Sequence, residues 1–495
     1  MTDDQRWDTL WAMSTLQERL LPESVAFTQA FVTIPMCCPE RASMLSGGFP
    51  PAETGVLTNS WPNGGALRFD DTDTMAVRFR SAGYTTGLFG KYLNEYEEIS
   101  PHIPPGWSRF VTQADNAPDW NDFEVVEGGI GEAGAVIEVE DYLTDWFTQQ
   151  ALSFIDRADG TPFFLYVPVR APHSPATPAP GDEVAFEDYL WRGGAWGEKD
   201  VTDKPDWVQA SSPMNDTNAI DDLVRRQLAT LQAVDRGLGV LMDGLEAAGV
   251  AENTVFVFTS DNGFMWGEHN QRSKGMPYEE SIRVPLLIAA PGIAPGTVEA
   301  LVAMNLDLPA TLYALAGVDA PTTGLDLGPL MRGEVDGVRD RILIEGYSGG
   351  QPIWSGVRTE TVKYVEYATG ETEHYDLSAD PTELESLSEA PDPEVVSWLA
   401  DNRGLAVTTD VLDAATVGAP YSVTITTWGG TAPLGFSITS GMLPDGLTMA
   451  DGVISGTPTM AGSFYFWVQV SDASVGVLSG EPQEFIARYT LEVEL

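Results

Sequence analysis

The chain has 495 residues, 43% of them hydrophobic, enough for a large core and for two or three domains. Its 73 acidic and 26 basic residues give a formal charge of −47, which argues against nucleic acid and anionic membranes as partners. No stretch is long and apolar enough to span a membrane, and two adjacent cysteines, Cys37 and Cys38, supply no disulfide framework.

The spacing of apolar residues predicts the main elements in chain order. Helical periodicity predicts helices over 70–82, 142–157, 219–249 and 307–317. Short apolar runs rich in β-branched and aromatic residues predict buried strands at 85–89, 162–168, 254–259 and 285–290. The stretch 101–135, rich in Trp, Asp and Gly, has weak periodicity and is predicted to be a loop.

The last third of the chain is predicted to contain mainly short strands. Short strands are predicted over 342–376, forming a small antiparallel subdomain. After about Arg403 the composition shifts, and alternation of Phe464, Phe466 and Val468 with more polar neighbours predicts a sandwich strand. This tail resembles the Ig-like modules of secreted and surface bacterial proteins. It carries no catalytic constellation, so a spacer role is favoured over glycan binding.

The two cysteines open a specific motif, Cys-x-Pro-x-Arg followed by Leu-Ser-Gly, over residues 37–47. It resembles the signature of the type I sulfatases, and its doubled cysteine is similar to the glucosamine-6-sulfatase branch. The resemblance implies that Cys37 is converted to formylglycine by a formylglycine-generating enzyme and acts as the nucleophile. Arg41 would supply a fixed cation beside it. Pro39 is expected to hold Cys38 in extended geometry.

Three further motifs match the family. Lys91 in Gly-Lys-Tyr-Leu-Asn and His173 in Ala-Pro-His each lie just past a predicted strand, where open α/β sheets bind ligands, and Lys274 follows Gly-Glu-His. The resemblance implies that these three are catalytic residues contacting the sulfuryl group. It also suggests Asn94 and His269 as substrate-binding residues.

The resemblance also implies a metal site. Asp3 and Asp4 match the family's acidic pair, although two acids at a terminus are ordinarily just solvated. Asp261 and Asn262 follow strand 254–259, taken as a parallel-type strand, although Asp-Asn-Gly alone reads as a turn. Together with Cys37 these are the expected ligands, and carboxylate and amide oxygens suit Ca²⁺ or Mg²⁺.

The resemblance covers about four-fifths of the chain and implies an α/β fold, an alkaline-phosphatase-like α/β/α sandwich with a small C-terminal antiparallel subdomain, plus an all-β Ig-like sandwich. The expected division is a catalytic domain at 1–335, a subdomain at 336–403 and an Ig-like module at 404–495. The implied activity is hydrolysis of sulfate esters, on sulfated sugars or glycans.

Two alternatives remain open. Phosphonate or phosphate-ester hydrolases of the same superfamily can share the cysteine motif. A non-catalytic glycan-binding surface protein is the other alternative, because Glu40 stands where the family usually has a small residue.

The start of the chain departs from the family pattern, in which an apolar strand precedes the acidic pair. Here no such strand and no signal peptide precede Thr2. We therefore expect the natural reading frame to begin upstream, with a signal peptide and an apolar strand, in a secreted, periplasmic or cell-surface protein. If it does not, another segment must fill the strand's place in the sheet.

Overall fold

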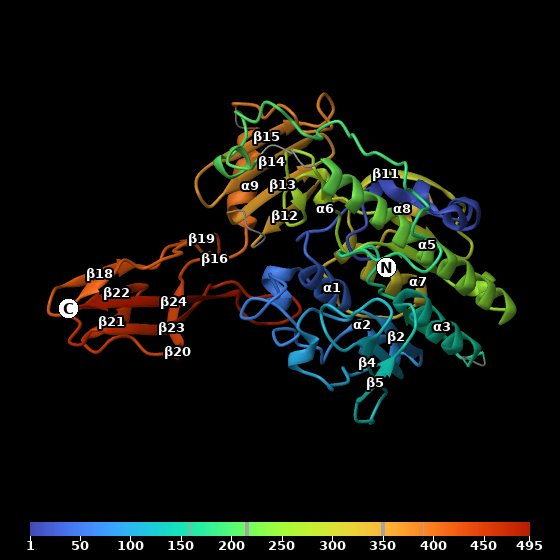
Figure 1. The fold of residues 1–495 in the computed structure, drawn as a ribbon, viewed down its shortest axis with the longest axis horizontal. Coiled ribbons are helices and arrows are strands. Elements are labelled where there is room, and N and C mark those ends of the chain that lie inside the picture. Colours follow the sequence, from blue (N-terminus) through green and yellow to red (C-terminus); the bar gives the residue numbers. More distant parts are fainter. Residues whose placement is uncertain (158–159, 213–216, 348–351, 390) are drawn as a thin grey trace.

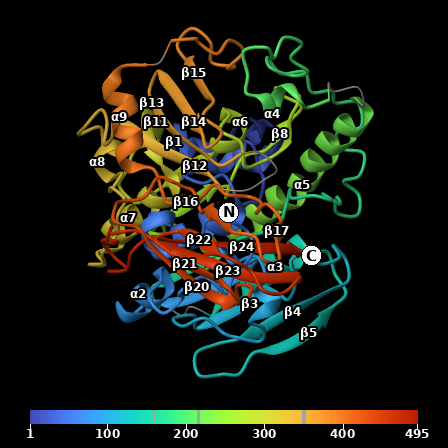
Figure 2. The ribbon, with the colours of Figure 1, turned by 90° about the vertical axis from the view of Figure 1, so that its left-hand side faces the viewer.

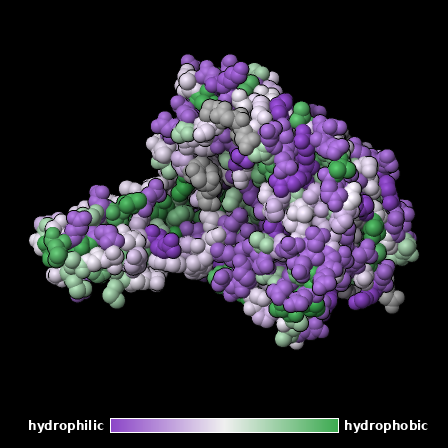
Figure 3. Space-filling model, in the orientation of Figure 1, coloured by the Kyte–Doolittle hydropathy of each residue, from purple (hydrophilic) through white to green (hydrophobic). Residues whose placement is uncertain are grey.

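The protein consists of a large body of helices and sheets, from which a narrower all-β unit projects (Figure 1). The computed structural model describes residues 1–157, 160–212, 217–347, 352–389 and 391–495. No helix within these ranges is long and apolar enough to cross a membrane. Hydrophilic residues dominate the face of the body drawn in Figure 3, in keeping with the excess of acidic residues.

Two sheets form the centre of the body. One has five strands, in the order β5 (Ala135–Val139), β4 (Phe123–Gly128), β3 (Arg109–Gln113), β2 (Thr85–Gly90) and β6 (Phe163–Tyr166). The other has four, in the order β11 (Gly296–Ala303), β1 (Val25–Phe31), β10 (Leu286–Ala289) and β7 (Phe256–Thr259). β2 is parallel to β3 and β6, and β1 is parallel to β11, whereas β10 is antiparallel to β1 and β7.

Helices cover both faces of these sheets, because successive strand residues point to opposite sides. Leu88 packs in one apolar cluster and its neighbour Phe89 in another, and Leu286 and Leu287 divide in the same way. On one face lie α1 (Cys37–Ser46), α2 (Met75–Ser81), α7 (Met304–Ala316) and α8 (Gly328–Met331); on the other lie α3 (Leu143–Asp156) and α5 (Thr217–Ala247). The result is an α/β/α sandwich.

The first residues of the chain join the two sheets. The backbone N–H of Val169 donates to the carbonyl of Met1 at 3.0 Å, next to β6. On the other side, the N–H of Thr2 donates to Thr259 at 2.9 Å, and the N–H of Asp261 donates to Thr2 at 3.1 Å. Within the described residues, β6 otherwise pairs only with β2, and β7 only with β10. Of the segments that the structure describes, only this one lies paired between β6 and β7.

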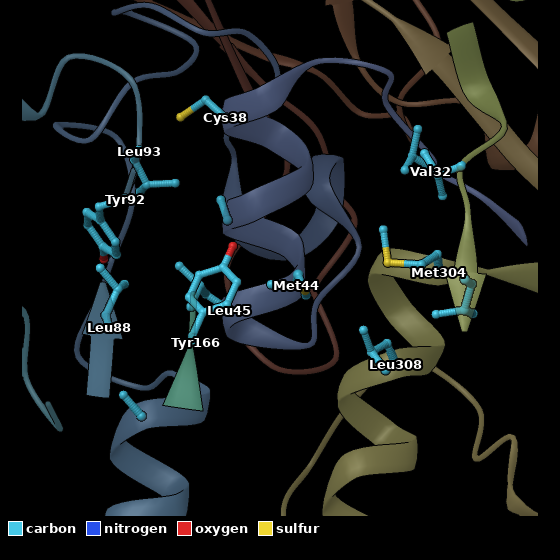
Figure 4. Packing of buried hydrophobic residues seen from close by; sticks show 14 of the residues in the cluster. Val32, Cys38, Met44, Leu45, Leu88, Tyr92, Leu93, Tyr166, Met304 and Leu308 are labelled. Atoms are coloured by element: carbon cyan, nitrogen blue, oxygen red, sulfur yellow. The ribbon is translucent and has the colours of Figure 1, made fainter. Parts of the chain in front are cut away.

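Helix α1 is held from two sides within the core (Figure 4). Leu88 of β2 and Tyr166 of β6 lie on one side, and Met304 and Leu308 of α7 lie on the other. Every residue of α1 before Ser46 is buried, and Gly47 ends the helix in the left-handed conformation that glycine adopts without strain. The packing therefore fixes the position of the first turn of α1.

A third sheet, antiparallel throughout, lies beside the two central sheets, in the order β12 (Arg341–Gly346), β13 (Trp354–Thr359), β14 (Val362–Tyr367) and β15 (Thr372–Asp376). Leu399 of α9 (Pro393–Asn402) packs against Val357 of this sheet. Trp354 packs with Phe31 of β1, and its indole N–H donates to the carbonyl of Gly275 at 2.9 Å. These contacts attach the subdomain to the body.

The body also contains several short elements. They are α4 (Asp206–Gln209), α6 (Glu279–Ile282), β8 (Met265–Trp266), β9 (Arg272–Ser273) and short helical segments at Trp7–Ala12, Leu16–Leu20, Leu21–Glu23, Pro50–Thr54, Tyr96–Glu98 and Ala251–Asn253.

The projecting unit, called here the C-terminal sandwich, comprises strands β16 to β24. One sheet has the order β17 (Ala415–Thr416), β24 (Glu484–Glu494), β23 (Gly462–Ser471) and β20 (Gly435–Gly441). The other has the order β18 (Tyr421–Thr424), β22 (Val453–Gly456) and β21 (Leu447–Ala450), and β16 (Ala406–Val407) pairs with β19 (Thr427–Trp428). Phe466, Val468 and Val470 point into the core between the sheets, as their alternation predicts.

The C-terminal sandwich is docked onto the body, and Figure 2 views it in front of the body. The side-chain amide of Asn63 donates to the carbonyl of Ile486 and accepts from the N–H of the same residue, each at 2.8 Å. The carboxylate of Glu53 accepts from the backbone N–H groups of residues 477–479. Leu57 of the body belongs to the same apolar cluster as the core of the sandwich. The two units thus share polar and apolar contacts.

Most predicted elements are confirmed, with three differences. The loop predicted over 101–135 is wrong: β3, β4 and the start of β5 lie there, because short strands give only weak periodicity. The strand predicted at 254–259 exists as β7, but the expectation of a parallel-type strand holds only in part. β7 is antiparallel to β10, and the only parallel pairing beside it within the described residues is the isolated bridge between Thr2 and Ser260. The helix predicted over 70–82 begins at Met75, because Asp70 accepts hydrogen bonds from Thr72 in a turn.

Candidate active site

Cys37 is the first residue of α1 and is fully buried. Its thiol therefore lies at the end of a helix where unpaired N–H groups favour negative charge. Both cysteines are free. The expected extended geometry of Cys38 is wrong, because Cys38 is helical; Pro39 is tolerated there, since first-turn N–H groups have no partner within the helix. The N–H of Cys38 donates instead to Oδ1 of Asn59 at 2.9 Å.

Three carboxylates from the two ends of the body meet beside Cys37. Oδ1 of Asp3 lies 3.3 Å from the thiol sulfur of Cys37. The N–H of Asp4 donates to Oδ1 of Asp261 at 3.1 Å, and the amide of Asn262 donates to Oδ1 of Asp4 at 2.7 Å. The pairing of the first residues with the strand before Asp261 therefore brings together groups more than 250 positions apart.

Three cations neutralise these carboxylates. Lys91 Nζ donates to Oδ2 of Asp3 at 2.5 Å. Lys274 Nζ donates to Oδ1 of Asp4 and lies 2.6 Å from the sulfur of Cys37. Arg41 reaches Oδ2 of Asp261 through Nε at 2.8 Å and Oδ2 of Asp3 through Nη2 at 3.3 Å. Its guanidinium fork thus connects two carboxylates.

Burial and charge shift the pKa values of this cluster in different directions. Burial alone raises the pKa of Asp3, but the neighbouring cations, Lys91 first among them, hold that pKa well below its usual value. Burial and then the charge of Asp3 raise the pKa values of both Cys37 and Asp261. Asp4 holds the pKa of Lys274 well above its usual value, although burial opposes this. The site therefore combines permanent cations with an ionised carboxylate.

His173 lies at the solvent-facing side of the cluster. Its side chain is 29% exposed, and Nε2 lies 3.7 Å from Oδ2 of Asp4. Nδ1 contacts the carbonyl of Ser174 at 2.7 Å, and because a carbonyl only accepts, Nδ1 carries a proton. Burial lowers the pKa of His173 although Asp4 opposes the shift. The neutral ring therefore presents a free Nε2 lone pair to the site.

The oxygen atoms of the cluster suit a hard divalent cation. Ligand atoms of Asp3, Asp4, Cys37 and His173 all lie within 4.8 Å of one another. Oδ1 of Asn262 is buried and has no hydrogen-bond partner among the described residues. A buried amide oxygen without a donor is costly unless a cation or water satisfies it. Three carboxylates and one amide oxygen are the ligand types that Ca²⁺ and Mg²⁺ prefer.

Sequence comparison assigns the family. The sulfatase family matches residues 1–318, about two thirds of the chain. The chain belongs to the sulfatase family. The C-terminal region of N-sulphoglucosamine sulphohydrolase matches residues 267–402 of this sulfatase, and an Ig domain matches residues 405–490. Membership makes the chain a sulfuric ester hydrolase, and the family generally carries a formylglycine and a divalent metal.

Individual relatives agree with this assignment. Human N-acetylglucosamine-6-sulfatase is 30% identical to this sulfatase over 80% of the chain and 81% of the human protein. The extracellular sulfatase SULF-1 homolog of Drosophila melanogaster is 30% identical over 69% of this chain and 31% of that protein. A protein solved in complex with its substrate D-glucosamine-2-N,6-O-disulfate shares the fold, with a TM-score of 0.67, 23% identity, and coverage of 81% of this chain and 94% of that one.

The two expected substrate-binding residues lie in different places in this sulfatase. Asn94 lies close to Cys38, whose thiol is near the Asn94 backbone, and its Oδ1 is buried without a hydrogen-bond partner among the described residues. His269 belongs to another buried group: Nδ1 contacts Glu198 at 2.7 Å, and the ring stacks on Tyr278. Burial lowers the pKa of His269 to about 4, so this ring is neutral. The structure brings Asn94, but not His269, to the cysteine pair.

Sequence reasoning missed Arg170 and noted Glu40 only as a departure from the family pattern. Arg170, three residues before His173, donates to the carbonyls of Pro118 and Ser174, and its charge acts on Asp3. The position of Arg170 in the loop after a predicted strand was the sequence feature that could have indicated a role in the site. Glu40 is fully buried, and its carboxylate has no hydrogen-bond partner among the described residues. Burial, and then the charge of Asp261, holds the pKa of Glu40 well above its usual value.

Proposed function

We propose that this sulfatase hydrolyses sulfate esters of sulfated sugars or glycans at the cluster around Cys37. The observation that carries the proposal is the position of Cys37 at the start of α1, in contact with both Asp3 and Lys274. A sulfuryl group bound there would meet a helix N-terminus and several cations at once. The sugar substrate is suggested by the names of the relatives.

In this proposal, Ca²⁺ or Mg²⁺ would be held by Asp3, Asp4, Asp261, Asn262 and the formylglycine matured from Cys37. When present, the metal supplies Lewis acidity, and the aldehyde hydrate supplies the nucleophilic hydroxyl.

The remaining residues bind and orient the ester. Lys91 and Lys274 place two ammonium groups where charge develops on the sulfuryl oxygens. His173 presents Nε2 at the exposed side, and once this nitrogen has taken up a proton it can donate that proton to the leaving oxygen. Arg41 holds Asp261 and Asp3 in place through its fork.

The proposal extends to the setting of the enzyme. A formylglycine-generating enzyme would be the partner required for maturation. Secretion, or a periplasmic or cell-surface location, is suggested by the extracellular relative. We also propose the division into a catalytic domain at 1–335, a subdomain at 336–403 and an Ig-like module at 404–495. The change of sheet after β11 and again after α9 supports these bounds.

The test compares esters that differ only in the transferred group. Purified protein, coexpressed with a formylglycine-generating enzyme, is assayed on aryl sulfate, aryl phosphate and aryl phosphonate esters of the same phenol. We expect the sulfate ester to have the highest kcat/KM, and mass spectrometry to find an aldehyde in place of the thiol of Cys37. Preference for the phosphonate ester would favour the alternative hydrolase. Absence of turnover by aldehyde-bearing protein would refute the proposal.

A further inference from the structure

Two tryptophans from different units meet where the C-terminal sandwich joins the body. Trp61 lies in the loop after α1, and Trp467 lies on β23. Their ring centroids are 6.1 Å apart and their planes are tilted by 42°. Trp61 is 42% exposed and Trp467 is half-buried. The pair therefore offers aromatic surface to solvent across the junction of the two units.

The aromatic surface continues along β23. Alternate residues of a strand share a face, so Tyr465 lies on the same face as Trp467, whereas Phe464 and Phe466 point to the other side, where Phe466 is fully buried. Tyr465 is 66% exposed. Trp61, Trp467 and Tyr465, which we call the aromatic strip, thus form a row that leads from the body onto the sandwich.

The side chain of Arg488 lies beside the aromatic strip. Arg488 of β24 is directly opposite Trp467 in the antiparallel register, which places both side chains on one face of the sheet. Arg488 is exposed and forms no ion pair with any residue that the structure describes. In a chain with a formal charge of −47, this arginine is available to an anionic ligand. Its planar fork suits an oxyanion.

The strip begins close to the nucleophile. Asn59, which accepts from the N–H of Cys38, is two residues before Trp61, so their Cα atoms are at most about 7 Å apart. The backbone N–H of Trp61 donates to Glu95 at 2.8 Å, and Glu95 directly follows Asn94 in the loop of Lys91. The loop carrying Trp61 is therefore fastened to both the nucleophile helix and the lysine loop.

The docking contacts fix the strip in place. Asn63, two residues after Trp61, binds the backbone of Ile486, two residues before Arg488, through two hydrogen bonds. Glu53 holds the loop 477–479 of the sandwich through three more. A surface that is already ordered loses little conformational entropy when it binds.

We propose that the aromatic strip and Arg488 form a subsite for further sugar rings of a sulfated oligosaccharide whose reacting ester lies at Cys37. This inference rests on the proposed function. Aromatic rings would stack on the apolar faces of pyranose rings, and the guanidinium of Arg488 would pair with a second sulfate group. The C-terminal sandwich then takes part in substrate binding, beyond the role of a spacer.

The test compares substrates of different length. Trp467→Ala and Arg488→Glu are assayed on an aryl sulfate, on 6-O-sulfated glucosamine, and on a heparin tetrasaccharide that ends in the same sugar. We expect KM for the tetrasaccharide to rise about tenfold in each variant, the size of about 1.4 kcal/mol, while the values for the aryl sulfate stay unchanged. Trp398→Ala is the matched control, a half-buried tryptophan under Arg341 on the subdomain, and should change neither.

Binding is measured separately, by calorimetry with the tetrasaccharide on protein carrying Cys37→Ala. Loss of affinity with Trp467→Ala in this background would support the subsite even if no sulfate ester is turned over, so failure of the proposed function is recognised independently. Equal tetrasaccharide KM and equal affinity in the wild type, the folded Trp467→Ala protein and the Arg488→Glu protein would refute the subsite.

Discussion

Asn63 offers a quantitative test of how firmly the C-terminal sandwich is docked. Its side chain is 8% exposed and forms two 2.8 Å hydrogen bonds with the backbone of Ile486, which is also buried. Asn63→Ala leaves one N–H and one carbonyl without a partner. Each buried unpaired group costs about 1–3 kcal/mol, so the docked state should lose about 2–6 kcal/mol, toward the lower end if water enters the gap. That loss rivals a sizeable part of the stability of a domain, about 5–15 kcal/mol.

The loss should appear at the interface before it appears in the core. We expect native-state hydrogen exchange of the Ile486 amide to accelerate by at least about thirtyfold, since each 1.4 kcal/mol is a factor of ten. Asn63→Asp keeps the acceptor but sets a carboxylate against the Ile486 carbonyl, and should weaken docking similarly. The control is Asn402→Ala, which removes one exposed hydrogen bond to Trp398 and should stay within about 0.5 kcal/mol of the wild type. Wild-type exchange at Ile486 in the Asn63→Ala protein would contradict this account.

Four further predictions concern the site. Cys37→Ala should abolish turnover of an aryl sulfate, whereas Cys38→Ala should keep most of it; equal rates in the wild type and Cys37→Ala would contradict the assignment. Arg41→Lys keeps the positive charge but loses the guanidinium fork, and should lower kcat about tenfold or more with little change in KM, as measured from initial rates. Removal of metal by a chelator should abolish activity, and added Ca²⁺ or Mg²⁺ should restore the initial rate. Because the pKa of Glu40 is raised on folding, deprotonation above the ordinary value of about 4.3 favours the unfolded chain. Glu40→Gln should therefore gain thermal stability relative to the wild type as the pH rises above about 4.3, and a pH-independent difference would count against this argument.

The sequence predicted that Lys91, His173 and Asp261 each follow a strand, and the structure places them near one another at the strand ends. Their roles were implied by the resemblance and stay predictions, and the pairing of residues 1–3 between the two sheets, which brings them together, left no local pattern. The helical state of Cys38 was missed, because the preference of a residue before proline is outweighed when the proline stands in a first turn. The contact of Asn63 with Ile486 spans 423 positions and leaves no local pattern. Such pairings depend on tertiary packing that periodicity does not record.

The pairing of the first residues between the two central sheets matters for anyone who produces this protein. Met1 contacts the carbonyl of Val167, and Thr2 is fully buried, so there is no room for a larger side chain at position 2 without a shift of the backbone. Such a shift would also move Asp3 and Asp4, which follow directly and lie beside the nucleophile. Leu495, at the far tip of the C-terminal sandwich, is 98% exposed (Figure 1). A fluorophore attached at this exposed position would therefore leave the segment that holds the carboxylates undisturbed.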